Sequence, residues 1–529
     1  MNIHKKRKFI DKRSGICALI LLGALIMLTA GAHSVYAKPD ASGGSDCVTC
    51  HKKHNAALVK QWEDSKHAEE EVSCIDCHGA DKGDIDGWEH HGEFISTIVT
   101  PKDCGGCHDK ELSEFAGSHH AKAGEILASL DNVLAEKVAG LPNNNSDAIN
   151  GCWQCHGTIV KFERDTKGEI VRTDEEGMPV IDATTWPNSG IGRLNPDGSK
   201  GSCNACHSRH NFDAGLARAP ENCGKCHLGP DHPQKEIYDE SKHGIAFYAN
   251  RDKMALDKDG EWILGRDYSA APTCATCHIS GYMSPNGRVI GNSHDVGGRI
   301  SWTLRPVVST KLNMVVYEDG FKEDYPESRT LPAVGDKVKT KQKAVKDYKM
   351  VSETVERKVA KVIRWNERRD KMKGACANCH SSSFVNNFYD QFDGLVNLYN
   401  DKFAKPAKQL MTDLKKDGVL NPDAPFEHSV QWIFFELWHH EGRRARHGAS
   451  MQGPDYTHWH GMYEVSKHFY DKFLPAVIEA AKSKSAELGK KYEAKVNALL
   501  SQEEHRWQKG LSPEEAKALR EEYKERYNQ

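Results

Sequence analysis

Eight copies of a Cys-x-x-Cys-His motif constrain this 529-residue chain more than any other feature, because they use sixteen of its seventeen cysteines. The two thiols of such a motif form thioethers with the vinyl groups of a haem, and the histidine becomes an iron ligand. Zinc sites built on Cys-x-x-Cys pairs do not require a histidine after every second cysteine, so eight histidines out of eight argue against zinc. The sequence therefore predicts eight haem c groups, attached through Cys47, Cys50 and His51; Cys74, Cys77 and His78; Cys104, Cys107 and His108; Cys152, Cys155 and His156; Cys203, Cys206 and His207; Cys223, Cys226 and His227; Cys274, Cys277 and His278; and Cys376, Cys379 and His380.

Further histidines are available as second iron ligands. The chain has 28 histidines, and setting aside the motif residues, His4 and His33 leaves eighteen for at most eight distal positions. His210 follows its own motif by three residues, so it cannot curl round to the opposite face of the same haem, and we expect it to bind a neighbouring haem. A Ser-His or Ser-x-His pattern repeats at several other candidates. The predicted distal ligands are His67, His91, His119 or His120, His210, His243 and His294, with His54 and His447 as weaker candidates.

Residues 1–37 have the pattern of a secretory signal peptide, in which Lys and Arg lead into an apolar run at 16–28 and Val35, Tyr36 and Ala37 offer a cleavage site. A retained membrane anchor is the alternative, although the apolar run is short for a bilayer span. Cytochromes c receive their haem outside the cytoplasm, so we expect export to the periplasm or an equivalent compartment. The leader also holds Cys17, which leaves no pair of cysteines for a structural disulfide.

Charge and composition narrow the range of partners. The leader carries six Lys or Arg and one Asp, so cleavage turns 72 basic and 75 acidic residues into 66 and 74, a net charge of −8 before haem propionates are counted. A mildly acidic protein is a poor partner for nucleic acid, and we expect a small uncharged or cationic substrate and a docking redox protein. Only 38% of the residues are hydrophobic, which is below average, so apolar porphyrin faces are expected to complete the core.

The fold class we predict is mainly α, with few short strands. Residues 38–383 are expected to form the haem-binding catalytic domain, with a haem-free insert at about 300–375. The alternating residues 158–181 predict a β-hairpin around Asp165 and Gly168, and a second hairpin is expected at 257–260. In the insert we expect short strands first, and then a Lys-rich part, 337–373, that is helical or solvated.

Residues 384–529 are expected to form a long helical module. Phe388, Phe392, Leu395 and Tyr399 recur at helical spacing, residues 430–446 are aromatic-rich, and residues 469–500 keep an apolar stripe. Near the end, residues 512–515 have the pattern of an N-cap, a first-turn proline and a capping-box glutamate. Such a module packs either within its own chain or against another subunit, and the sequence leaves both possibilities open.

The sequence resembles the octahaem hydroxylamine oxidoreductase family, whose members oxidise hydroxylamine or hydrazine in nitrifying and anammox bacteria. The resemblance covers nearly the whole chain after the leader. It rests on eight motifs in this order with a long gap before the eighth, and on four stretches between and after them. These stretches are residues 229–232 followed by 241–244, residues 292–295, residues 446–448, and residues 453–461.

The resemblance implies that the fourth haem, held by His156, is catalytic and lacks a distal protein ligand. In the family this haem is bonded to a tyrosine from a neighbouring subunit of a homotrimer. By position that tyrosine is Tyr456, with Tyr463 as the second choice, and a simple packing role is the alternative for Tyr456. Asp231 and His232 match the distal-pocket pair, against the alternative of a surface turn after Pro230. Tyr282 and Met283 are also candidate pocket residues.

The function implied is oxidation of hydroxylamine to nitric oxide or nitrite, with seven bis-histidine haems that pass electrons to a soluble cytochrome c. An open ferric site binds a nitrogen lone pair, and Asp231 and His232 are suited to accept protons near neutral pH. The resemblance leaves open hydrazine oxidation to dinitrogen, in which case the compartment is the anammoxosome lumen. Two further functions fit the motifs, namely nitrite reduction and electron transfer alone by a multihaem cytochrome.

Overall fold

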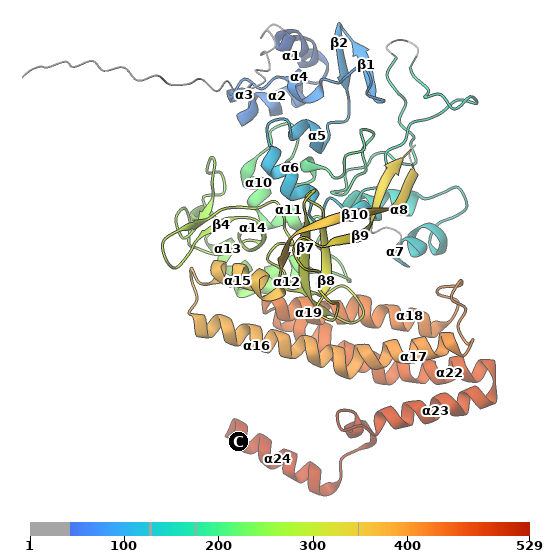
Figure 1. Cartoon of the computed structure of the whole chain (residues 1–529). Helices are drawn as coiled ribbons and strands as arrows, with labels where there is room; N and C mark the ends of the chain where they lie inside the picture. Colours follow the sequence, from blue (N-terminus) through green and yellow to red (C-terminus); the bar gives the residue numbers. More distant parts are fainter. Residues whose placement is uncertain (1–42, 126–129, 174, 176, 347–348, 529) are drawn as a thin grey trace, which may run out of the picture.

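The computed structural model describes residues 43–125, 130–173, 175, 177–346 and 349–528. The predicted signal peptide and Cys17 lie outside these residues. Along the described chain, Figure 1 shows the N-terminal segments at one end, short helices and loops in the middle, and long helices at the other end. In the described part, no helix is long and apolar enough to cross a membrane.

Short helices carry most of the attachment motifs. The helices α4, α9 and α14 each consist of the five motif residues, and Thr273, for example, caps α14 by accepting a hydrogen bond from the Thr276 amide. A five-residue helix presents both cysteines and the histidine on one side, which is the arrangement that a haem edge requires. The helices up to the eighth motif are α1 Gly43–His54, α2 Ala56–Glu63, α3 Lys66–Glu69, α4 Cys74–His78, α5 Pro101–Cys104, α6 Asp109–Ala116, α7 Leu130–Val133, α8 Ser146–Asn150, α9 Cys152–His156, α10 Ala214–Arg218, α11 Pro220–Gly224, α12 Gln234–Glu240, α13 Lys242–Ala249, α14 Cys274–His278 and α15 Trp365–Cys376.

Three small sheets interrupt the helices. β1 Gly87–His90 and β2 Glu93–Ser96 form a hairpin, and β4 Gly281–Met283 pairs with β3 Ile263–Leu264 in parallel and with β5 Val289–Ile290 in antiparallel fashion. The third sheet has the order β6-β7-β10-β9, with β8 on the other side of β7. Its strands are β6 Trp302–Thr303, β7 Thr310–Tyr317, β8 Lys322–Pro326, β9 Lys337–Lys346 and β10 Lys349–Ile363. Few, short strands outside this sheet agree with the predicted mainly α fold, which the similarity to solved structures reported below also confirms.

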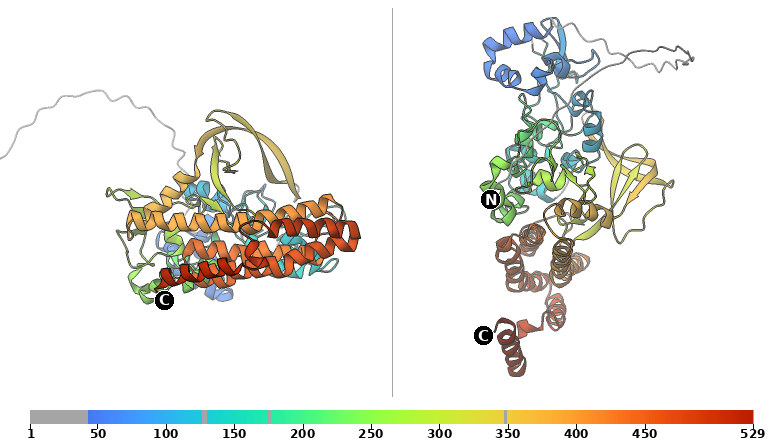
Figure 2. Two further views of the ribbon diagram at one scale, coloured as in Figure 1. Left: turned by 90° about the horizontal axis from the view of Figure 1, so that it is seen from below. Right: turned by 90° about the vertical axis from the view of Figure 1, so that its left-hand side faces the viewer.

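The prediction of a helical or solvated segment at 337–373 is wrong for most of that range. Residues 337–346 and 349–363 are strands of a long antiparallel hairpin, visible in Figure 2 as an arm that extends from the sheet, and helix begins only at Trp365. Covered and exposed residues alternate along residues 351–359 of β10, with Val355, Arg357 and Val359 on the covered side, and this period of two is that of a pleated strand. The lysines suggested a solvated helix because their charge obscured this alternation.

The two hairpins predicted at 158–181 and 257–260 have different outcomes. Around Asp165 the chain does turn back, with Arg164 opposite Ile170, although the pairing consists of isolated bridges and not of regular strands. At 257–260 the hairpin prediction is wrong, because β3 pairs in parallel with β4 and not with a preceding strand. A Gly-containing turn indicates a change of direction, but the partner of the next strand is set by packing that the local sequence does not show.

After the eighth motif the chain forms the predicted long helices. Three continuous helical stretches, 382–416, 429–451 and 454–484, each contain π-helical segments, and their side chains enclose the largest apolar core of the protein around Phe403, Phe469 and Phe473. The stripe at 469–500 is divided at Ser485, which is extended and caps the next helix, so it forms two helices instead of one. Ser512 and Glu515 form the predicted capping box. The helices are α16 Ser382–Tyr399, α17 Lys405–Lys416, α18 Ser429–Glu436, α19 Gly442–Met451, α20 Pro454–Thr457, α21 Glu464–Lys467, α22 Leu474–Lys484, α23 Ala486–Leu500 and α24 Pro513–Tyr527, and the π-helical segments among them are η5 Asn400–Ala404, η6 Leu437–Glu441, η7 His458–Tyr463 and η8 His468–Phe473.

Candidate functional site

Most motif histidines face a second imidazole from elsewhere in the chain. Two imidazoles that bind one metal ion from opposite sides, each at about 2 Å, hold their ring centres roughly 6 Å apart. Within the described residues, six motif histidines face a second imidazole at that spacing. The pairs are His51 and His90 at 6.1 Å, His67 and His108 at 6.3 Å, His78 and His210 at 6.5 Å, His120 and His227 at 6.1 Å, His207 and His294 at 6.5 Å, and His243 and His380 at 6.0 Å.

Hydrogen bonds at the other ring nitrogen support the same interpretation. His78 Nδ1 lies 2.9 Å from the carbonyl oxygen of Ser96, and His278 Nδ1 lies 3.2 Å from that of Val296. A histidine that binds metal through Nε2 commonly donates its Nδ1 proton to a backbone carbonyl, which fixes the tautomer and the ring orientation. The residues present therefore fit haem c with two axial imidazoles at the paired positions.

Two predicted distal histidines need correction. His90, and not His91, faces His51, because His91 occupies the β1–β2 turn with a φ of +50° and is exposed. Of His119 and His120, only His120 faces a motif histidine, whereas His119 Nε2 lies 2.8 Å from Asp324 Oδ2. The sequence could not distinguish these neighbours, since adjacent residues point in different directions whose sense depends on the local backbone.

The weaker candidates also differ from one another. His54, at the end of α1, is exposed and makes no ring contact in the described part of the chain. His447 is buried in α19, and its Nε2 has no hydrogen-bond partner among the described residues. Burial first, and then the nearby Arg446, hold the pKa of His447 well below its usual value, so this imidazole is neutral near pH 7.

His227 has two imidazoles at similar distances. The ring centre of His120 lies 6.1 Å away and that of His232 lies 5.9 Å away. Only one of them can lie across an iron atom from His227. His232 follows His227 by five residues, and its Nδ1 lies 2.8 Å from the carbonyl oxygen of Leu228. The loop between the two histidines therefore fixes the orientation of the His232 ring.

His156 and His278 are the two motif histidines that face no other ring within the described ranges. They are distinguished by their surroundings. His156 Nδ1 is buried. The pKa of His156 is lowered by burial first and then by Arg305, whereas a backbone hydrogen bond with Ala123 and the carboxylates of Asp131 and Asp231 act in the opposite direction. Charged residues of both signs therefore lie close to His156.

Asp231 is held on the loop that follows the sixth motif. Gly229 begins this loop with a φ of +88°, a conformation that favours glycine. Asp231 Oδ1 lies 3.3 Å from His232 Nδ1, and Oδ2 lies 3.3 Å from Arg443 Nη1. Both side chains are about one fifth to one quarter exposed, and the charge of Asp231 acts to raise the pKa of His156, so this loop lies near the fourth motif.

Two arginines near this pair were not predicted from the sequence. Arg443, near the start of α19, binds Asp231 and donates from Nε to the carbonyl oxygen of Arg305. Arg305 is exposed in the described chain, and its positive charge lowers the pKa of His120, His156 and His227. Five charged or titratable residues in the run 439–444, within an otherwise aromatic helix, were the available signal for such a cluster.

Tyr456 lies in α20 and is half-buried. The preceding Gly453 packs against Ile237 of α12, so the start of α20 lies beside the helix that follows Asp231 and His232. Tyr456 contacts the His460 ring at 5.6 Å, and Tyr463 is 47% exposed beside Trp459, which is 57% exposed. Part of each tyrosine side chain is therefore exposed on the surface of its own chain. The bond to a haem of a neighbouring subunit stays a prediction.

Tyr282 and Met283 lie in β4. Tyr282 is 5% exposed and belongs to an apolar cluster with Trp262 and Tyr268, and its hydroxyl approaches Gly374 of α15. This position is in a packed core that supports the seventh and eighth motifs, so the structure gives Tyr282 a packing role.

Neighbouring motif cysteines connect the sites into a path. Cys104 and Cys203 are within hydrogen-bonding reach, as are Cys155 and Cys226, and Cys223 and Cys274. Further close pairs join the first motif to the second, the second to the third, the fifth to the sixth and the seventh to the eighth: Cys47 and Cys74, Cys77 and Cys104, Cys206 and Cys223, and Cys277 and Cys376. The attachment points thus form one continuous series, from which the His156 site branches at the sixth motif.

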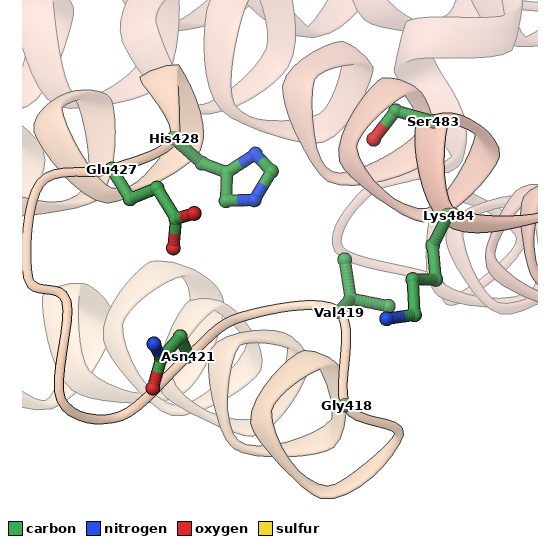
Figure 3. Close-up of a pocket in the computed structure, with 7 residues that line it drawn as sticks. All are labelled: Gly418, Val419, Asn421, Glu427, His428, Ser483 and Lys484. Atoms are coloured by element: carbon green, nitrogen blue, oxygen red, sulfur yellow. The ribbon is translucent and has the colours of Figure 1, made fainter.

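A separate pocket opens at the far end of the helical module. Figure 3 shows it between the loop that follows α17 and the end of α22, where Glu427, His428 and Lys484 point towards one space. No motif cysteine or motif histidine lines it. It is therefore not part of the haem-binding region.

The comparisons with known proteins agree with the haem sites. A family model described as "Seven times multi-haem cytochrome CxxCH" matches residues 197–330 and 338–425, and a model for "Cytochrome c554 and c-prime" matches residues 103–178. The chain is 26% identical over 383 residues to a protein of Kuenenia stuttgartiensis described as a "probable nitrite reductase-hydroxylamine oxidoreductase fusion protein". That alignment covers 66% of this chain and 35% of the other, so the chain spans about a third of the length of this relative.

Two solved structures are similar. One, described as a "hypothetical multiheme protein", has a TM-score of 0.65 and 26% identity, and the alignment covers 83% of this chain and 96% of that one. The other is the reducing HAO-like protein complex of Kuenenia stuttgartiensis, with a TM-score of 0.51 and 19% identity over 83% of this chain and 85% of that one, which indicates a similar fold. The motifs, the opposed imidazoles and these matches define a multihaem cytochrome c. The chain is thus a haem-based redox protein.

Proposed function

We propose that the chain is an oxidoreductase that converts hydroxylamine to nitric oxide or nitrite at the haem held by Cys152, Cys155 and His156. The observation that carries this proposal is the contrast between six paired motif histidines and His156, which has charged residues nearby and faces no imidazole of the part of the chain that the structure describes. His278 is also unpaired, but only His156 has Asp231 nearby. The name of the curated relative includes hydroxylamine oxidoreductase together with nitrite reductase, which supports a redox reaction of a small nitrogen compound.

The pocket residues have distinct tasks. When bound, the haem at His156 supplies an iron position that takes the substrate nitrogen and accepts its electrons. Asp231 accepts protons from the substrate, and its ion pair with Arg443 fixes the carboxylate in place. His232, tethered through Nδ1 to Leu228, keeps Nε2 available as a second proton acceptor. The series of motif cysteines supports electron exit through seven further haems, for which we assign His120 as the partner of His227 and propose a soluble cytochrome c as acceptor.

Nitrite reduction is the second candidate, because one observation favours it. Arg305 and Arg443 place two cations beside the pocket, and cations attract an anionic substrate such as nitrite. A solved relative is also described as a reducing complex. Tyr456 bears on this choice, since a tyrosine bond to the haem in a homotrimer is the feature that we associate with the oxidative reaction.

The test compares the two directions with one protein. Haem-loaded protein is mixed with hydroxylamine and an oxidised cytochrome c, and separately the reduced protein is mixed with nitrite, while haem absorbance is recorded. We expect faster turnover with hydroxylamine, and a loss of about a hundredfold or more in Asp231→Asn, because proton acceptors typically contribute that much. Asp239→Asn, on the neighbouring helix α12, is the matched control. Turnover with nitrite alone would contradict the oxidative assignment.

A further inference from the structure

The hairpin of β9 and β10 is an element that the proposed reaction does not use. It extends from the third sheet as an arm, and a strand of ten residues such as β9 is about 33 Å long. Residues 337–363 carry nine Lys or Arg and three Asp or Glu. Taking them from the mature totals of 66 and 74 leaves 57 basic and 71 acidic residues, so the arm is a basic element of an acidic protein.

The lysines of this arm gather on one of its two faces. In β9 they occur at every second residue, and successive side chains of a strand point to opposite faces. The antiparallel register adds Lys358 to this face, directly opposite Lys337. Residues 337, 339, 341 and 358 are exposed and residue 343 is half-buried. We call this surface the lysine face, and its members are Lys337, Lys339, Lys341, Lys343 and Lys358.

Stability alone does not account for the lysine face. Like charges directly opposite each other on neighbouring strands, as at Lys337 and Lys358, are destabilising. Lysines on an outer strand such as β9 discourage pairing with another sheet, but Lys358 belongs to β10, which lies between β7 and β9. Lys339 and Lys341 form no ion pair with a described residue, so their charges are available to a partner.

The opposite face of the arm is fixed by Arg357, which is 8% exposed. Its Nε donates to Asp319 Oδ2 at 2.6 Å, and its guanidinium carbon lies 4.1 Å from the centre of the Phe321 ring. The same guanidinium donates hydrogen bonds across to Thr340 and Gln342 of β9. The two strands are therefore held together on this side. A surface that is ordered before binding loses little conformational entropy when a partner docks.

The arm is tied to the chain beside two haem attachment sites. Lys200, three residues before the fifth motif, donates a hydrogen bond from Nζ to the carbonyl oxygen of Lys343 and also forms an ion pair with Glu125. Gly124, the residue before Glu125, packs against Gly157, which directly follows the fourth motif. The outer part of the arm therefore lies next to the segments that carry the fourth and fifth motifs.

We propose that the lysine face docks a small electron carrier with an acidic surface. Four lysines about 7 Å apart along β9 concentrate positive charge, which attracts and orients an acidic partner. The rest of the protein is acidic and repels the same carrier, so the docking position is specified. One electron then passes from a reduced haem to the oxidised carrier, and no bond or proton changes place. The inference rests on the electron exit in the proposed function and names the kind of acceptor and its docking surface.

The experiment measures electron transfer without a nitrogen substrate. Oxidised haem-loaded protein is mixed at low ionic strength with reduced flavodoxin, a small acidic electron carrier, or with reduced riboflavin, and haem absorbance is recorded. In Lys339→Glu combined with Lys341→Glu, we expect reduction by flavodoxin to slow by at least about tenfold and reduction by riboflavin to keep its rate. Lys408→Glu combined with Lys490→Glu, at exposed positions of α17 and α23, is the matched control because it changes the net charge equally.

Salt and a milder variant separate docking from damage to the fold. Added salt should slow reduction of the unaltered protein by flavodoxin and remove most of the difference between the variants. Lys339→Gln combined with Lys341→Gln should show a smaller loss, since it removes charge without reversing it. An equal loss in both Glu variants, or a rate that does not depend on salt, would overturn the proposal.

A membrane surface is the other partner that a basic arm could bind. Binding to phosphatidylglycerol vesicles that is lost in Lys339→Glu combined with Lys341→Glu, while reduction by flavodoxin stays unchanged, would assign the arm to a membrane and overturn docking of a carrier. Because hydroxylamine and nitrite are absent from these experiments, their outcome is independent of the substrate proposed above.

Discussion

The imidazole of His90 faces that of His51 with ring centres 6.1 Å apart, while the next residue, His91, is exposed in a turn. His90 ends β1, so the strand fixes its direction, whereas the turn at His91 and Gly92 points its side chain away from the first motif. Which of the two adjacent histidines faces His51 therefore depends on a short hairpin of two four-residue strands.

The first prediction uses this pair. His90→Ala should remove the second ligand of the first haem and convert that haem to a high-spin or ligand-accessible state, because one axial position then lacks a nitrogen donor. His91→Ala should leave all low-spin signals unchanged and is the built-in control. Electron paramagnetic resonance of the oxidised proteins measures both. A high-spin signal in His91→Ala alone would show that the pairing is wrong.

The second prediction concerns the number of haems. The intact mature protein should carry eight covalent haems, because each Cys-x-x-Cys-His motif supplies both thiols and the proximal histidine. Intact-mass measurement gives this number directly. Replacing Cys376 and Cys379 with alanine should lower the mass by one haem, and seven haems in the unaltered protein would contradict the prediction.

Local motifs carried most of the sequence information about the site. The attachment residues follow from spacing alone, and five of the predicted distal positions, His67, His120, His210, His243 and His294, do face motif histidines. His90 was missed because no local rule says which of two adjacent rings points inward. Around Asp231, the sequence predicted only the neighbouring His232. Arg305 and Arg443 were missed because they lie about 75 and 210 residues further along the chain and come near Asp231 only in the folded protein.

Helices were likewise easier to predict than strands. The spacing of Phe392 and Tyr399 gives a helix directly, because both residues repeat on one buried face. The strand β10 was missed because its pairing with β9 and β7 is non-local and because the covered position between Val355 and Val359 is a charged residue, Arg357, so the sequence shows no apolar alternation there. Strand preference depends on such partners more than helix preference does.

The third prediction concerns the packing of the eighth motif. Asp393 of α16 accepts hydrogen bonds from Arg369 Nη2 at 2.7 Å and from Trp302 Nε1 at 2.7 Å. Asp393→Ala leaves the buried guanidinium of Arg369 unpaired, which should cost about 3 kcal/mol of unfolding free energy. Asp401→Ala, which removes an exposed ion pair with Lys405, should cost less than about 1 kcal/mol. Urea denaturation of both variants measures the difference.

The same pair predicts how stability depends on pH. Burial raises the pKa of Asp393, but the hydrogen bonds from Arg369 and Trp302 outweigh it and hold the pKa below its usual value of 3.8. A lowered pKa in the folded state means that the stabilisation is present above about pH 4 and fades as the pH falls below it. The difference in unfolding free energy between Asp393→Ala and the unaltered protein should therefore narrow in acid. A difference that grows below about pH 4 would contradict the ion pair.

The last prediction concerns Tyr456, which we expect to bond covalently to the haem at Cys152 and Cys155 of a neighbouring subunit in a homotrimer. Its ring is only partly covered by its own chain, and α20 lies beside α12, the helix that follows Asp231 and His232. A second covalent attachment would distort the porphyrin and favour removal of electrons from a nitrogen substrate. In a ring of subunits each chain gives one tyrosine and receives one, so the contacts close on themselves.

Tyr456→Phe should therefore keep eight haems, abolish the covalent oligomer on a denaturing gel and suppress hydroxylamine oxidation, because phenylalanine has no hydroxyl through which the phenol can react. Tyr463→Phe is the matched control, since Tyr463 lies one to two turns further along the same helical stretch and is 47% exposed. If the covalent oligomer persists in Tyr456→Phe and disappears in Tyr463→Phe, then Tyr463 forms the bond. If neither variant nor the unaltered protein shows a covalent oligomer, the haem at His156 is not cross-linked, and the two arginines beside Asp231 then favour nitrite reduction as the reaction of this site.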